Sequence, residues 1–265
     1  MYIILIIIFL IFILSKNKVE NFITSKKQNK LFIILSQKVT KNMYKKYSEI
    51  IPKNLIFISD KIPEIKKCNI YYYSDKLMKD NGFYGMHSTI KITSWDKCFY
   101  HLQNNLKYSY YWIIEDDCYL NKNSINDYFK KLEKNNSDAL LFGWYKSYFK
   151  QDKWMHWNLN KNHFENIHLK ASINQIIRIS KKLVEKLLLF HKKNNKLLFH
   201  EILISSTISK YNLTYQIIDR SDIHNRAVKK NSIINTIYKN NKQLALKDIK
   251  NKYIIVHPFK LWYDL

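Results

Sequence analysis

The chain has 265 residues and a strongly basic composition, with 45 lysine or arginine residues against 21 acidic ones and a formal net charge of +24. Only 3 residues are glycine, whereas phosphate-binding loops and nucleophile elbows need glycine where the backbone turns with positive φ or approaches a ligand closely. Gly82, Gly85 and Gly143 form none of the glycine motifs of such sites. The sequence therefore argues against a Rossmann dehydrogenase, a P-loop NTPase, a protein kinase and an α/β-hydrolase.

The positive charge comes almost entirely from lysine. Arg178, Arg220 and Arg226 are the only arginines, and arginine is the residue whose planar guanidinium binds guanine or phosphate through two parallel hydrogen bonds. Lysine, asparagine, isoleucine and tyrosine are all abundant, so we attribute the charge to AT-rich codon usage and expect no specific nucleic-acid partner. The basic field would still attract a nucleotide diphosphate or an acidic acceptor. The three cysteines are widely spaced with no CxxC pair, and we expect ordinary half-buried free thiols.

The N-terminal region divides into an apolar run over residues 2–14 and a polar linker over residues 15–30. As a helix the run would span about 20 Å, short of a hydrocarbon core of about 30 Å, so we interpret residues 1–14 as a signal or membrane-anchor segment. Lysines follow the run, which weakly favours a cytosolic domain over a secretory one. The alternative is a first buried strand or core helix. Residues 31–265 are expected to form a single domain.

Beyond the linker, apolar runs rich in β-branched and aromatic residues alternate with helical patterns, which is typical of an α/β domain. We predict strands over residues 31–36, 54–59, 69–74, 110–114, 138–144, 173–179, 213–218 and 253–256. We predict helices over residues 40–50, 93–106, 124–134, 180–190 and 199–211. Thr93 or Ser94 is expected to cap the second helix, and Ser180 the fourth. Residues 154–168 are expected to form an irregular loop, and residues 229–252 are ambiguous, with an exposed helix as one interpretation.

The most informative motif is the segment YYWIIEDD, residues 110–117, where a buried-type strand runs directly into three carboxylates. Side chains alternate along an extended strand, so Glu115 and Asp117 should share one face while Asp116 points to the other. Adjacent carboxylates repel each other, and a divalent cation removes that penalty. Oxygen ligands select Mg²⁺ or Mn²⁺, and open α/β sheets bind ligands at the carboxyl ends of their strands.

The alternative to a metal site is a solvated acidic turn after an edge strand. An acidic triplet behind a hydrophobic strand is less expected in a chain with only 21 acidic residues, and this scarcity favours metal binding.

The order of motifs resembles the GT-A nucleotide-sugar glycosyltransferases, whose central strand ends in a DxD-type motif. The shared order is a strand, a Trp-Asp-Lys helix, an apolar strand, the acidic triplet, a His-Glu helix and a terminal histidine. The segment YYWIIEDDCYL is similar to that of family 25-like transferases and their relatives in large viruses and algae. The resemblance covers roughly residues 31–260 and implies a GT-A-like, Rossmann-like, mixed and mostly parallel sheet flanked by helices.

The resemblance also implies a set of metal and donor contacts. Asp117 would be the main metal ligand, Glu115 would hold the metal, the ribose or a metal-bound water, and His257 after the last strand would be a further ligand. A lone histidine is more often structural, and this alternative stays open for His257. The remaining residues expected at the nucleotide are Asp116, Asp60, Asp75, Lys97 and Lys260.

Glu201, at the start of a predicted helix, resembles the acidic residue that faces the acceptor in many GT-A enzymes. A carboxylate half-buried among apolar residues can have a pKa near neutrality, as a general base requires. An idle role at a helix N-terminus is the alternative. Trp144, Trp154, His156 and Trp157 are expected either to stack on a sugar ring or to pack as an aromatic loop.

The sequence thus predicts a metal-dependent glycosyltransferase that moves a sugar from a nucleoside diphosphate sugar to a hydroxyl of a glycan or protein acceptor. A metal-dependent nuclease is one alternative, because Glu64, Ile65 and Lys66 form an ExK triplet. Such a triplet must lie on a strand, whereas Pro63 suggests a loop. A membrane-tethered binding protein without catalytic activity is the other alternative.

Overall fold

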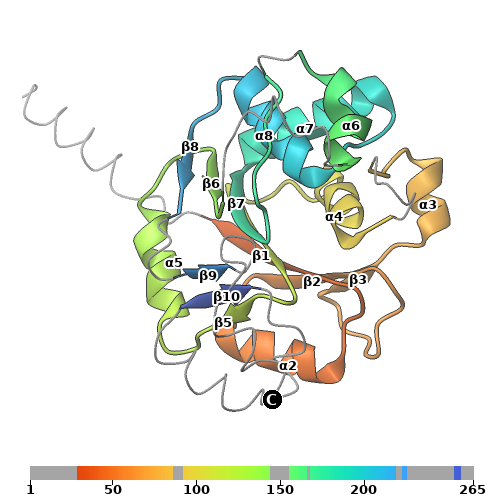
Figure 1. Ribbon diagram of the computed structural model, residues 1–265. Helices are drawn as coiled ribbons and strands as arrows, with labels where there is room; N and C mark the ends of the chain where they lie inside the picture. The colour runs from red at the N-terminus through yellow and green to blue at the C-terminus, as the bar shows by residue number, and fades with distance from the viewer. Residues whose placement is uncertain are drawn as a thin grey trace, which may run out of the picture.

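A mixed β-sheet runs through the middle of the protein, with helices on both of its faces (Figure 1). The structure is a computed structural model and describes residues 29–85, 92–143, 155–165, 168–218, 223–225 and 254–257. The predicted segments over residues 1–28 and 229–252 lie outside these ranges. Within them, no helix has the length and apolar character needed to cross a bilayer.

The described strands and helices follow one another in the alternating order that the sequence predicts. The strands are β1 (Lys30–Ser36), β2 (Leu55–Ser59), β3 (Ile70–Tyr72), β4 (Tyr110–Glu115), β5 (Tyr119–Leu120), β6 (Ala139–Leu141), β7 (Ile176–Ser180), β8 (Tyr215–Ile217), β9 (Ile223–Asn225) and β10 (Ile255–His257). The helices are α2 (Lys41–Ile50), α3 (Asp75–Asp80), α4 (Ser94–Gln103), α5 (Ile125–Glu133), α6 (Met155–Asn160), the 3-10 turn η1 (Lys161–His163), α7 (Lys181–Asn194) and α8 (His200–Lys210).

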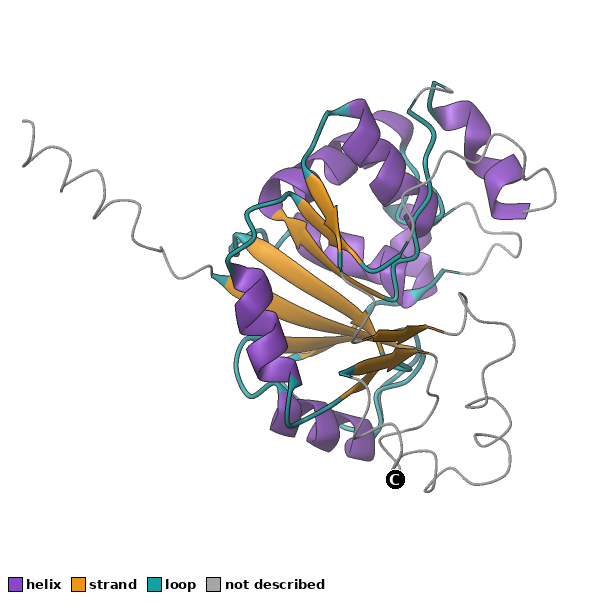
Figure 2. Cartoon of the chain, turned by 60° about the vertical axis from the view of Figure 1, so that its left-hand side comes forward, coloured by secondary structure: helices purple, strands orange, loops and turns teal. Residues whose placement is uncertain are grey.

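The large sheet has seven strands in the order β3-β2-β1-β4-β7-β6-β8. The first four are parallel, β7 is antiparallel to both β4 and β6, and β6 and β8 are parallel. The predicted mixed, mostly parallel sheet flanked by helices is confirmed. A second sheet of three strands, in the order β5-β10-β9, lies beside it (Figure 2).

Alternating side chains of the central strands build two separate hydrophobic cores. Tyr111 and Ile113 of β4 belong to the core shared with α4, α7 and α8, whereas Trp112 and Ile114 belong to the core shared with α2 and α5. Figure 1 shows these two helical layers on opposite faces of the sheet. Burial on both faces explains why these strands are apolar at every position rather than at every second one.

Polar residues cap several of the described helices, and the sequence predicts two of these caps, at α4 and α7. Thr40 accepts a hydrogen bond from the backbone N–H of Met43, and Ser180 accepts one from Leu183. At α4 it is Thr93 rather than Ser94 that precedes the helix, and its backbone N–H donates to the carboxylate of Asp96 at 2.8 Å. These contacts satisfy backbone groups that the first turn of a helix leaves without partners.

Several predicted elements differ from the structure. The expected loop over residues 154–168 contains α6 and η1, and the short elements α3, β5 and β9 have no counterpart in the prediction. The predicted strand over residues 138–144 ends already at Leu141. Strands of two or three residues carry too little hydrophobic pattern to be recognised, because neighbouring strands rather than local preference hold them.

Candidate metal and active site

The acidic triplet lies where β4 leaves the large sheet. Glu115 is the last residue of this strand and follows Tyr111 and Ile113 on the face covered by α4, α7 and α8. The chain then turns at once, since the backbone N–H of Cys118 donates to the carbonyl of Glu115 at 3.0 Å. This turn brings Asp117 back toward Glu115.

Glu115, Asp117 and His257 form a cluster in which one ligand atom of each lies within 4.8 Å of the others. Nε2 of His257 is 3.2 Å from Oδ1 of Asp117 and 3.7 Å from Oε2 of Glu115. All three side chains are half-buried. Two carboxylates and an imidazole at this spacing are a donor set that suits Mn²⁺, and also Mg²⁺ when water and phosphate oxygens complete the shell.

The raised pKa of Glu115 is also consistent with a site for a cation. Burial raises the pKa of Glu115 to about 7. A hydrogen bond from the indole of Trp95 lowers this pKa, while the charge of Asp117 raises it. His257 then lowers it, and Glu201 raises it. A cation between the carboxylates would stabilise their ionised forms, because it replaces the water that burial removes.

Asp116 points away from this cluster, as the alternation of side chains predicts. The hydroxyl of Ser36, the last residue of β1, donates to Oδ2 of Asp116 at 2.5 Å. The backbone N–H of Asp116 donates to the carbonyl of Leu35 at 2.9 Å. The triplet is therefore divided between a group of two carboxylates beside His257 and one carboxylate held by β1.

Glu201 lies in the first turn of α8, on the same side of the large sheet as Glu115. Burial raises the pKa of Glu201 to about 7, and a hydrogen bond from the backbone of Asn174 lowers it in part. Glu201 is close enough to raise the pKa of Glu115 through its charge. A carboxylate of this pKa exists in both protonation states near neutral pH, which is the property that a general base needs.

The structure brings together Asp60, Asp75 and Lys97 as one group beside β2. The ammonium of Lys97, fully buried in α4, donates to the carbonyl of Asp60 at 2.6 Å and lies 3.0 Å from Oδ1 of Asp75. Asp75 begins α3 and does not end a strand as expected, while its side chain remains 59% exposed. Lys97 thus ties the end of β2 to α3 and α4, and contact of these three residues with a nucleotide stays a prediction.

Sequence reasoning missed a stack of rings that connects the cluster to α8. The rings of Trp95 and His200 are parallel to within 5° with centroids 4.3 Å apart. Phe199 lies against His200 at 4.6 Å and stacks on His156 of α6 at 3.9 Å. These residues come from three separate helical segments, so no local spacing could have indicated the stack.

Other predicted residues have separate outcomes. Trp157 is buried in the core, as the packed-loop alternative expects. Trp144, Trp154 and Lys260 lie outside the described residues. The ExK triplet is in a bend and not on a strand, and Glu64 is in an ion pair with Lys38 at 3.1 Å, which argues against the nuclease alternative. Cys68, Cys98 and Cys118 are free thiols as expected, but they are not half-buried: Cys68 is exposed, and Cys98 and Cys118 are buried.

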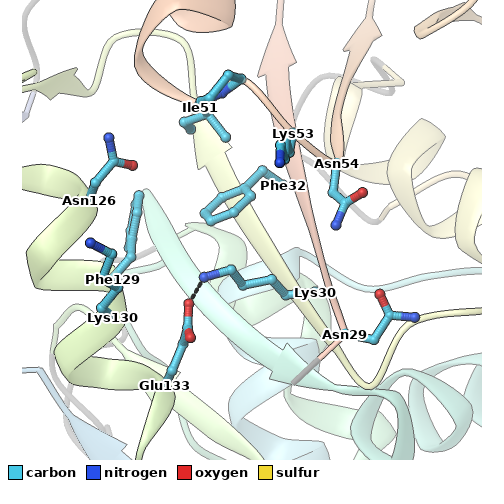
Figure 3. Close-up of a pocket in the computed structure, with 11 residues that line it drawn as sticks. Asn29, Lys30, Phe32, Ile51, Lys53, Asn54, Asn126, Phe129, Lys130 and Glu133 are labelled. Atoms are coloured by element: carbon cyan, nitrogen blue, oxygen red, sulfur yellow. Dashed lines mark ion pairs between the residues drawn. The ribbon is translucent and has the colours of Figure 1, made fainter. Parts of the chain in front are cut away.

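A pocket of about 720 Å³ lies at the opposite end of the large sheet (Figure 3). Lys30, the first residue of β1, lines the pocket and forms an ion pair with Glu133 of α5. Register places Lys30 beside Tyr110 and Leu35 beside Glu115, so the pocket and the acidic cluster are at opposite ends of β1 and β4. Phe32 and Phe129 are among the apolar residues that line it. This pocket is therefore separate from the candidate metal site.

No family model matches the chain, and no curated protein matches it. Among solved structures, the chain is similar to a glycosyltransferase involved in glycosylation of the major capsid of PBCV-1, with 11% identity, a TM-score of 0.40 and coverage of 88% of this chain and 95% of that one. It is also similar to an active-site mutant of LgtC, with 10% identity, a TM-score of 0.43 and 86% of each chain covered.

A third similar structure is mouse xyloside xylosyltransferase 1, with 10% identity, a TM-score of 0.42 and coverage of 86% of this chain and 97% of that chain. Likenesses this distant carry no weight for the reaction or its substrate. The resemblance to family 25-like transferases stays an expectation.

Proposed function

We propose that the protein is a metal-dependent glycosyltransferase that moves a sugar from a nucleoside diphosphate sugar to an acceptor hydroxyl. The observation that carries this proposal is the cluster of Glu115, Asp117 and His257 at the carboxyl end of β4, the edge where open α/β sheets bind ligands. Glu201, a half-buried carboxylate of raised pKa on the same side of the sheet, supplies the second group that such a reaction needs.

Asp117 and Glu115 would hold Mn²⁺ or Mg²⁺ together with Nε2 of His257. When bound, the cation neutralises the negative charge that develops on the diphosphate leaving group. Backbone structure supports all three side chains, since Glu115 ends β4, Asp117 lies in the hydrogen-bonded turn that follows, and His257 ends β10. A preorganised site of this kind spends little binding energy on its own reorganisation.

Glu201 would act on the acceptor. If the reaction inverts the anomeric centre, its carboxylate accepts the proton of the attacking hydroxyl, and a pKa of about 7 suits this role at neutral pH. If the configuration is retained, no base of this kind is required and Glu201 orients the acceptor instead. Either role needs the carboxylate to remain beside the metal cluster, where its charge influences Glu115.

The donor nucleotide would bind along the same edge of the sheet. Asp116, Asp60 and Asp75 are proposed contacts for its ribose or base, and Lys260 for its phosphates. Lys97 is proposed to act on the nucleotide site by holding Asp60 and Asp75 in place, because its ammonium is buried against them. Asp60 directly follows β2 and Asp116 directly follows β4. Because β1 lies between these two parallel strands, their ends open toward one continuous edge.

The acceptor is proposed to be a glycan or a protein. We further propose that residues 2–14 associate with a membrane, either as a single N-terminal anchor or as a secretory signal. Attachment at this end would leave the carboxyl edge of the sheet accessible, because Lys30 at the start of β1 and Glu115 at the end of β4 mark opposite ends of the parallel strands.

A donor screen tests the proposed function. Purified protein is incubated with UDP-, GDP- and CMP-sugars with and without Mn²⁺, and release of the nucleotide product is measured for the native chain and for Asp117→Asn. We expect metal-dependent release with one donor and its loss in the variant, with unchanged far-ultraviolet circular dichroism. Full activity of the variant, or no binding of any donor by calorimetry, would refute the proposal.

A further inference from the structure

The side chain of Trp95 contacts the candidate metal site directly. Trp95 lies in the first turn of α4 and is only 4% exposed. Its indole N–H donates to Oε1 of Glu115 at 2.9 Å. The other oxygen, Oε2, lies 3.7 Å from Nε2 of His257. The two oxygens of this carboxylate therefore have different neighbours. Oε1 is bound to Trp95, and Oε2 is the oxygen near His257.

The rings of His200 and Phe99 pack against the indole of Trp95. His200 at the start of α8 stacks on it with an interplanar angle of 5°, and Phe99 of α4 contacts it at 6.2 Å between centroids. A buried indole N–H without an acceptor costs free energy, so the bond to Glu115 favours this orientation of the ring. The ring plane and the donor direction are thus both fixed.

We propose that Trp95 is a positioning residue that orients the carboxylate of Glu115 for metal binding; this inference rests on the metal site of the proposed function. The terminal torsion of a glutamate rotates over a broad range. The indole N–H removes this freedom by binding Oε1, and Oε2 is then presented toward His257 and Asp117. Groups that orient a metal ligand in this way typically change metal affinity by about 10- to 100-fold.

Trp95→Phe tests this inference, because phenylalanine retains an aromatic ring against His200 but lacks the N–H. Trp112→Phe is the matched control. Trp112 is a buried tryptophan of β4 on the opposite face of the sheet, and its Nε1 has no hydrogen-bond partner within the described ranges. Mn²⁺ affinity is measured on the full-length chain without donor, from the electron paramagnetic resonance signal of free Mn²⁺.

We expect Trp95→Phe to weaken Mn²⁺ binding by about tenfold or more and Trp112→Phe to change it by less than about twofold. Equal affinity of Trp95→Phe and the native chain, or an equal loss in Trp112→Phe, would overturn the inference. Absence of Mn²⁺ binding by the native chain would instead refute the metal site. If Trp95→Phe does not fold, Trp95→Tyr takes its place with the same expectation, since its hydroxyl leaves the ring in a different direction from the indole nitrogen.

Discussion

Nε2 of His257 lies 3.2 Å from Oδ1 of Asp117, although 140 positions separate the two residues along the chain. Asp117 follows β4 of the large sheet, and His257 ends β10 of the small sheet. The pairing of Val256 with Tyr119 places them together, since Tyr119 begins β5 only two residues after Asp117. Register between β5 and β10 therefore determines whether the imidazole reaches the carboxylates.

The division of the acidic triplet predicts that isosteric changes at two adjacent carboxylates affect metal affinity very differently. Asp117→Asn should weaken Mn²⁺ binding by more than the roughly 10- to 100-fold that loss of an outer-shell partner costs. Asp116→Asn should leave affinity within about twofold, since Asp116 is bound to Ser36 and points away from His257. Calorimetric titration with MnCl₂ measures both variants. Comparable losses in the two would contradict the division.

Without the His257 imidazole, Mn²⁺ should no longer stabilise the folded protein against heat. A ligand that binds only the folded state at 100 times its Kd stabilises that state by about 2.7 kcal/mol. We expect Mn²⁺ to raise the Tm of the native chain and EDTA to reverse the rise. In His257→Ala the rise should be largely lost at the same Mn²⁺ concentration. His168→Ala, beside Ser209 at the far end of α8, serves as the control and should respond like the native chain.

If the reaction inverts the anomeric centre, the pH dependence of sugar transfer should report the ionisation of Glu201. A base must be deprotonated to accept the proton, so kcat/KM should rise with pH through about 7, the raised pKa of Glu201. Glu201→Gln should lower the rate by about 100-fold or more and remove this inflection. A variant that keeps both the rate and the inflection would show that Glu201 has no catalytic role.

Glu201 should also lower stability at high pH. Its pKa is raised from 4.5 to about 7 in the folded state, so the folded protein binds more protons than the unfolded chain between these values. Stability is therefore lost as pH rises from about 4.5 to about 7. We expect metal-free Glu201→Gln to exceed the native chain in free energy of unfolding by about 2 kcal/mol at pH 8 and by little at pH 4.5. Urea denaturation at the two pH values measures the difference, and a constant difference would contradict burial of the charge.

Much of the site was accessible from sequence because its carboxylates follow a strand. The predicted grouping of Glu115 with Asp117, apart from Asp116, is present in the structure. However, Asp117 lies in the turn after β4, so this turn and not strand alternation brings it beside Glu115. The apolar runs likewise predict the central strands, since burial on both faces demands apolar residues throughout. Asp75 shows the limit of this reasoning: it follows a strand-like run but begins α3, because the strand ends earlier, at Tyr72.

The sequence by itself determined the alternation of strands and helices and the acidic end of β4, because both depend on residues that are neighbours along the chain. Only the tertiary structure decided that Trp95 binds Glu115, that His200 stacks on this indole and that His257 reaches Asp117. These contacts join residues from different elements. Their distances depend on how helices pack across the sheet and how β5 pairs with β10, which no local pattern encodes.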